Sequence, residues 1–157
     1  MAAKIARRAA YLRGMPRYIG IDWGAVRTGL AATDRDCIIA SPLKTVPTAT
    51  LFDELTRLVA AEACAGFVVG MPGALVHASA GSDAHSRPGI EACVAELNRR
   101  FPSLPVHLVD EGFSSREARL SLVLGGMPKK RREEKGATDR VAAALILQRF
   151  LEGRGGG

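Results

Sequence analysis

The segment that most constrains the fold is residues 18–34, YIGIDWGAVRTGLAATD. Ile19 and Ile21 alternate along a short apolar run, and a second apolar run follows a turn bounded by glycines, which is the pattern of a β-hairpin. Asp22 departs from this pattern, because strands disfavour aspartate and a carboxylate among apolar groups is costly unless it is paired, hydrogen-bonded or bound to a metal. The segment therefore predicts a hairpin that holds one acidic side chain for a purpose other than packing.

Apolar periodicity divides the rest of the chain into strands and helices. Strands are expected at 17–23, 28–33, 35–46, 65–72 and 104–111, and helices at 51–64, 89–101, 114–126 and 137–152. The first three strands are joined by short turns, the second of them at Asp34 to Asp36, and form an antiparallel meander, whereas the later strands follow crossovers and add in parallel. This predicts an α/β fold with a mixed five-stranded sheet, an antiparallel meander plus parallel strands, flanked by helices on both faces. A strand of the meander lies next to the first parallel strand, which is the plan of a ribonuclease H-like fold.

The length and charge of the chain limit the classes of protein to consider. A chain of 157 residues forms one domain, and we expect a basic, disordered extension at 1–16, the domain at 17–152 and a flexible tail at 153–157. The net charge of +6 favours polyanionic partners, nucleic acid first. No apolar run reaches the ~18 residues of a membrane span, so no membrane partner is expected. The three cysteines lack metal-site spacing, which argues against zinc and disulfides and fits a reducing, intracellular compartment.

Further acidic residues stand at positions that could meet Asp22. Asp110 and Glu111 end the strand at 104–111, at the carboxyl edge where sheets of this kind bind ligands. Asp139 opens the last expected helix. It shares a helical face with four apolar residues, Ala142, Ala143, Ile146 and Phe150. Because that face packs against the sheet, Asp139 points inward, and three acids far apart in the sequence could meet at one edge.

Converging carboxylates repel one another unless a cation joins them. Oxygen donors without cysteine suit Mg²⁺ or Mn²⁺, and two such ions serve phosphodiester cleavage. Structural roles remain open at this point. Asp139 could complement the positive end of its helix, and Asp110 or Glu111 could be an ordinary loop acid or cap.

Five segments, in order along the chain, carry a resemblance to a known family. They are GIDWGAVRTGLA, SPLKTV, VVGMP, VDEGFSSREA and TDRVAAALILQRFLE, and they extend from about residue 18 to 152. Together they resemble the motifs of the YqgF/RuvX family. The resemblance implies a ribonuclease H-like, metal-dependent nuclease of the bacterial cytoplasm, of the kind described as pre-16S rRNA nucleases and as Holliday-junction-resolvase-like.

The resemblance also implies roles for individual residues. Asp22, Glu111 and Asp139 match the acidic catalytic and metal-binding positions, and Asp110 matches a neighbouring acid that could add a ligand. Gly112 stands where the family has arginine, and Arg116, one helical turn on, could replace it. Phosphate contacts are expected from Arg27, Arg116, Lys129, Lys130, Arg131 and Arg132. The last four lie in KKRREEK, which could equally be a solvated loop of mixed charge.

The leading hypothesis is a hydrolase, a divalent-metal-dependent nuclease that processes the 5′ end of pre-16S rRNA. RNA is favoured over branched DNA on family grounds alone. The alternatives are a Holliday junction resolvase acting on branched DNA, a non-catalytic nucleic-acid-binding or ribosome assembly factor, and a nucleotide binder of the sugar-kinase or actin type. The last needs two such domains, and this chain supplies one. The sequence leaves open endo- or exonuclease action, Mg²⁺ or Mn²⁺, and monomer or homodimer.

Overall fold

The computed structural model describes residues 1–2, 16–72, 87–111 and 136–155. The expected helix at 114–126, and with it Gly112, Arg116 and the residues from Lys129 to Arg132, lie outside the described residues. The elements are β1 (Arg17–Asp22), β2 (Arg27–Thr33), β3 (Ala40–Pro47), the 3-10 turn η1 (Thr48–Thr50), α2 (Leu51–Ala61), β4 (Cys64–Pro72), α3 (Arg87–Arg100), β5 (Val106–Glu111) and α6 (Ala137–Gly155). In the described ranges, no helix has both the length and the apolar character needed to cross a membrane.

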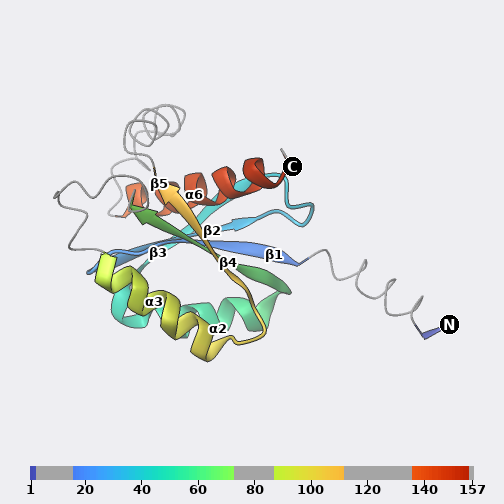
Figure 1. Cartoon of the computed structure of the whole chain (residues 1–157), viewed down its shortest axis with the longest axis horizontal. Helices are drawn as coiled ribbons and strands as arrows, with labels where there is room; N and C mark the ends of the chain where they lie inside the picture. Colours follow the sequence, from blue (N-terminus) through green and yellow to red (C-terminus); the bar gives the residue numbers. More distant parts are fainter. Residues whose placement is uncertain (3–15, 73–86, 112–135, 156–157) are drawn as a thin grey trace.

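The strands form one mixed sheet with the order β3-β2-β1-β4-β5. β1 pairs with β2 and β2 with β3 in antiparallel fashion, whereas β4 lies parallel to both β1 and β5. The predicted meander and parallel strands are therefore confirmed, and β1 lies at the centre of the sheet between them (Figure 1).

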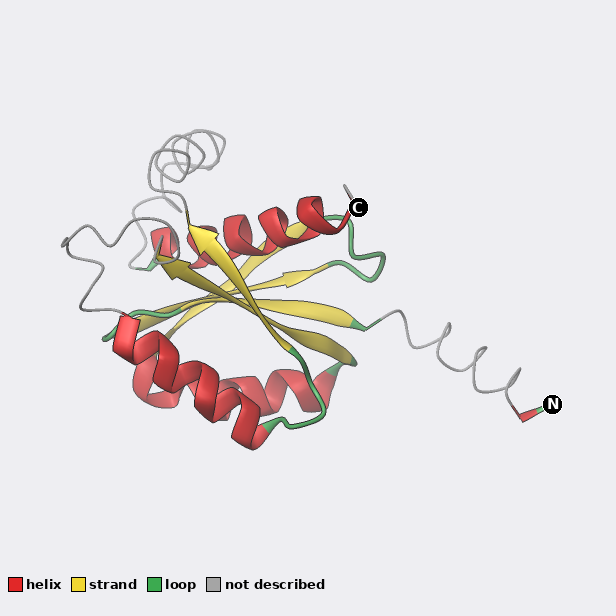
Figure 2. Ribbon diagram, viewed as in Figure 1, coloured by secondary structure: helices red, strands yellow, loops and turns green. Residues whose placement is uncertain are grey.

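Helices cover both faces of the sheet, as predicted. α6 lies on one face, and α2 and α3 lie side by side on the other (Figures 1 and 2). Alternate residues of β1 serve the two layers. Ile19 and Ile21 are fully buried in the core shared with α2 and α3. Gly20 faces α6, where a Cβ atom would lie 2.8 Å from the carbonyl oxygen of Ala143 and 2.9 Å from Cβ of Leu147, so this helix lies very close to the strand.

β3 begins later than predicted, at Ala40 rather than at residue 35. The reason is the side chain of Asp34, whose Oδ1 accepts backbone N–H groups from Ile38 at 2.7 Å and Ile39 at 3.0 Å. These bonds close a loop in which Cys37 has a positive φ of 54°. An aspartate that bonds to backbone groups just ahead of it favours a turn over a strand. The turn predicted at Asp34 to Asp36 is therefore confirmed but continues through Ile39, and the prediction of a strand over 37–39 was wrong.

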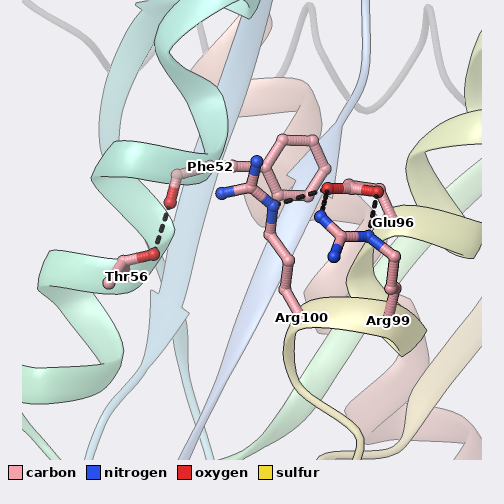
Figure 3. Close-up of polar contacts among 5 residues, drawn as sticks. All are labelled: Phe52, Thr56, Glu96, Arg99 and Arg100. Atoms are coloured by element: carbon pink, nitrogen blue, oxygen red, sulfur yellow. Dashed lines mark hydrogen bonds and ion pairs between the residues drawn. The ribbon is translucent and has the colours of Figure 1, made fainter.

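Figure 3 shows polar contacts within α2 and within α3, and one arginine of α3 that reaches the ring of Phe52 in α2. Arg99 and Arg100 donate to the same carboxylate oxygen of Glu96, each at 2.6 Å. The Arg99 guanidinium, helped by Arg100, lowers the pKa of Glu96 to about 2. Arg100 also lies over the ring of Phe52 in α2, 4.9 Å from its centroid. These arginines are thus engaged with partners on the α2 and α3 face, on the other side of the sheet from α6.

Candidate active site

Asp22 is the last residue of β1 and is half-buried. Its Cα pairs with that of Gly29 in β2, across the turn that joins the two strands. Thr48 holds this turn from η1, because its hydroxyl donates to the carbonyl of Gly24 at 2.5 Å and its N–H donates to the carbonyl of Val26 at 3.0 Å. The turn, and with it the end of β1, is therefore tied to the far edge of the meander.

The first turn of α6 lies directly on Gly29. A Cβ atom at Gly29 would overlap the carbonyl group of Asp139 and lie 2.7 Å from the backbone nitrogen of Arg140. The helix starts just after Gly136, which has a φ of 87° and whose carbonyl accepts the N–H of Asp139 at 3.1 Å. Since Gly29 is the pairing partner of Asp22, the structure brings Asp22 and Asp139 to the same edge of the sheet.

Arg27 makes a long-range ion pair with Asp139. Its Nε lies 3.2 Å from Oδ2 of the carboxylate, and the two side chains are 44% and 28% exposed respectively. Arg27 opens β2 and stands two residues before Gly29, so it shares the α6 face of the strand. Sequence reasoning assigned Arg27 to phosphate and missed this pairing. The sequence does show that Arg27 lies two residues before Gly29 and so on the same face of the strand. This spacing indicates a contact with α6 only when the packing of α6 on Gly29 is already known.

The acids of β5 divide between the faces of the sheet. His107 and Val109 pack toward α6, where the ring of His107 lies 4.8 Å from that of Phe150. Asp110 belongs to the alternate series and is exposed. Strand alternation therefore assigns position 111, rather than 110, to the face that carries Asp22 and Asp139.

The structure describes the backbone of Glu111, which pairs with Pro72 at the carboxyl end of β4, but not its side chain. Among the described side chains, no three carboxylate, histidine or cysteine groups gather in a way that could hold a metal ion. Of the three acids predicted to meet, the structure thus places two.

The side chain of Trp23 packs on the face of the sheet opposite to α6 and holds the end of β1 there. Its indole ring lies on Gly89 in the first turn of α3, where a Cβ atom would lie 2.5 Å from two of the ring carbons. The ring also packs against the core beneath β1. A glycine at position 89 therefore lets the aromatic side chain next to Asp22 pack closely on α3.

Known proteins are similar to this chain over most of its length. A family model described as RuvX, Holliday junction resolvase, matches residues 16–153. A Porphyromonas gingivalis protein named "Putative pre-16S rRNA nuclease" is 40% identical over 138 residues, which cover 88% of this chain and 97% of that protein. Among solved structures, T. thermophilus RuvC in complex with Holliday junction substrate has a TM-score of 0.54 at 17% identity, covering 90% of this chain and 96% of that one.

A second solved structure has the same fold. The Fowlpox virus resolvase in complex with Holliday junction DNA has a TM-score of 0.55 at 9% identity, and covers 88% of this chain and 98% of its own. At such low identities the likeness concerns the fold alone. The predicted ribonuclease H-like fold and the resemblance inferred from the five segments are both confirmed.

Proposed function

The chain belongs to the RuvX family, described as Holliday junction resolvase, and from this membership we propose that it is a divalent-metal-dependent nuclease acting on precursor 16S rRNA in the bacterial cytoplasm. Two relatives named "Putative pre-16S rRNA nuclease" match this chain over 97% of their own length, and their name supports this choice of substrate. The observation that carries the proposal is the meeting of Asp22 and Asp139 at one edge of the sheet, next to Arg27.

The donor set fits Mg²⁺ or Mn²⁺. Asp22 ends a central strand and Asp139 lies in the first turn of the helix above it, so both carboxylates come from firmly held backbone. Carboxylate oxygens are the ligands that these hard cations prefer. Asp22, Asp139 and Glu111 would hold the ions, and strand alternation makes Asp110 the less suitable fourth ligand. The chemistry that such ions supply is stabilisation of the attacking and leaving oxygens of the phosphodiester.

The basic side chains would hold the nucleic acid. Arg27 stands at the same edge as the acids and can approach a phosphate bound there. The other proposed phosphate contacts are Arg116, Lys129, Lys130, Arg131 and Arg132. Together these residues would hold the scissile bond over the carboxylates, which on their own repel a polyanion.

Binding of Mn²⁺ or Mg²⁺ should raise the melting temperature of the protein by several degrees at millimolar metal. The reason is that the ions bind only the folded state, in which the carboxylates are together. Circular dichroism melts with EDTA and with metal measure the shift, and in Asp22→Asn the shift should shrink. A melting temperature that is the same with EDTA and with millimolar metal would count against the proposed metal site.

The substrate is tested by offering labelled precursor 16S rRNA, an unrelated linear RNA and a four-way DNA junction side by side, each with and without Mn²⁺. We expect metal-dependent cleavage of the precursor at rates above those of the other two. Preferential cleavage of the junction would instead support the resolvase activity that the family description names. Binding of the precursor without cleavage under all conditions would favour a non-catalytic assembly factor.

A further inference from the structure

We propose that Arg27 is the built-in counter-ion of the site: it neutralises Asp139 while no divalent cation is bound and gives up this carboxylate when one binds. The released guanidinium is then available to a phosphate of the nucleic acid. The inference rests on the proposed function, because it takes the carboxylates of Asp22 and Asp139 as metal ligands. It assigns to Arg27 a role at the metal site in addition to phosphate binding.

The ion pair is unlike most others among the described residues. Arg57 with Glu54, Arg87 with Glu91, and the pairs of Glu96 are contacts between residues three or four apart on one helix. Arg27 and Asp139 instead join the start of β2 to the first turn of α6, 112 residues away in the sequence. Because α6 packs directly on Gly29, the backbone of Asp139 is fixed beside this strand. The fold therefore holds the guanidinium and the carboxylate together.

Electrostatics explains why a positive charge next to Asp22 and Asp139 is favourable. Two carboxylates at one edge of a sheet repel each other, and a nearby positive charge favours their ionised forms. Arg27 supplies one positive charge and contacts Asp139 through Nε. A divalent cation supplies two and can be shared by both aspartates, but it also repels a guanidinium that stays on the same carboxylate. Binding of the divalent cation therefore weakens the ion pair between Arg27 and Asp139, and the ion pair in turn weakens binding of the cation.

The exposure of the pair makes the exchange inexpensive. Arg27 is 44% and Asp139 28% exposed, and ion pairs that water reaches in this way contribute little to stability. Because this pair has to break when the divalent cation binds, it should lower the cation affinity of the wild type by no more than about fivefold relative to a protein without the pair. A fully buried pair would resist exchange, whereas a divalent cation can displace Arg27 from this exposed pair and leave the guanidinium available to a phosphate.

The release of Arg27 can be observed directly by NMR of the full chain. We expect the ¹⁵N–¹H signal of the Arg27 Nε group to move during a titration with MgCl₂, with a midpoint equal to the dissociation constant from calorimetry. The signal is assigned by its disappearance in Arg27→Lys. Arg57, which pairs with Glu54 at 3.0 Å on α2, is the matched control, and its Nε signal should stay in place.

Calorimetry on Arg27→Gln supplies a second readout that does not depend on activity. Mg²⁺ affinity should rise by about two- to fivefold, because the competing cation is gone, while Arg57→Gln should bind Mg²⁺ like the wild type. An unmoved Arg27 signal at saturating Mg²⁺, or a weaker affinity in Arg27→Gln, would overturn the inference and leave the metal site intact. Absence of Mg²⁺ and Mn²⁺ binding by the wild type would instead contradict the proposed function itself.

Discussion

Replacement of Asp22 by asparagine is expected to lower the cleavage rate by about 100- to 1,000-fold. Enzymes lose activity on this scale when one major electrostatic contact to the transition state is removed. Asparagine keeps the shape of the side chain but loses its charge and one of its two ligand oxygens. Nucleic-acid affinity should persist or increase, because one negative charge facing the phosphates is removed. The metal-free melting temperature should hold or rise, since repulsion between acidic side chains at this edge decreases.

A purely structural Asp22 predicts the reverse result, with a lower melting temperature and activity lost only in proportion to unfolded protein. Asp34→Asn is the matched control, because Asp34 lies at the other end of the same hairpin and bonds to the backbone of Ile38 and Ile39. That variant should lose some stability and keep its cleavage rate per folded molecule. Measurement of cleavage, affinity and melting on both variants separates the two roles. Full activity per folded molecule in Asp22→Asn would falsify the mechanism proposed above.

Replacement of Gly29 by alanine is expected to cost at least about 100-fold in cleavage per folded molecule, although Gly29 carries no chemical group. The added methyl group would overlap the carbonyl of Asp139, so the first turn of α6 has to lift away from β2. A displacement of about 1 Å at a catalytic group is enough for a loss of that size. The overpacking should also lower the free energy of unfolding by about 1–3 kcal/mol.

Two other glycines separate positioning from general damage. Gly20→Ala crowds the same helix further along, at Ala143 and Leu147, and should destabilise the protein while leaving the first turn of α6 and the rate per folded molecule nearly unchanged. At Gly153, near the end of α6, no atom of the described residues other than the helix's own nearby backbone lies within 4 Å of the added methyl group, so Gly153→Ala should be neutral or slightly stabilising. Equal losses of rate per folded molecule in Gly29→Ala and Gly20→Ala would contradict a positioning role for Gly29.

Much of this fold can be predicted from local patterns. The short turns after β1 and β2 leave little choice but an antiparallel meander, and the helices that follow require parallel strands. The same reasoning correctly takes Asp22 and Asp139 to one edge, because the first ends a strand at the sheet centre and the second opens a helix whose apolar face covers that sheet.

The parts that could not be predicted depend on side chains that contact residues remote in sequence or on their own backbone. The ion pair of Arg27 with Asp139 requires the register of β2 against α6, which no local pattern gives. The late start of β3 depends on Asp34 bonding to the backbone, which apolar periodicity ignores. Asp110 and Glu111 are adjacent in an apolar strand, so only the observed packing of Val109 tells which face each position belongs to.

The packing of Trp23 on Gly89 gives the protein an optical label of its own. Trp23 is the only tryptophan in the chain, and it follows Asp22 directly. Its ring is held between the end of β1 and the first turn of α3, with one edge against Gly89. Fluorescence emission excited at the indole band therefore arises from a single place, one residue from the proposed metal ligands. Changes at this edge of the sheet can thus be followed in the unmodified protein, with no dye attached and no second tryptophan to subtract.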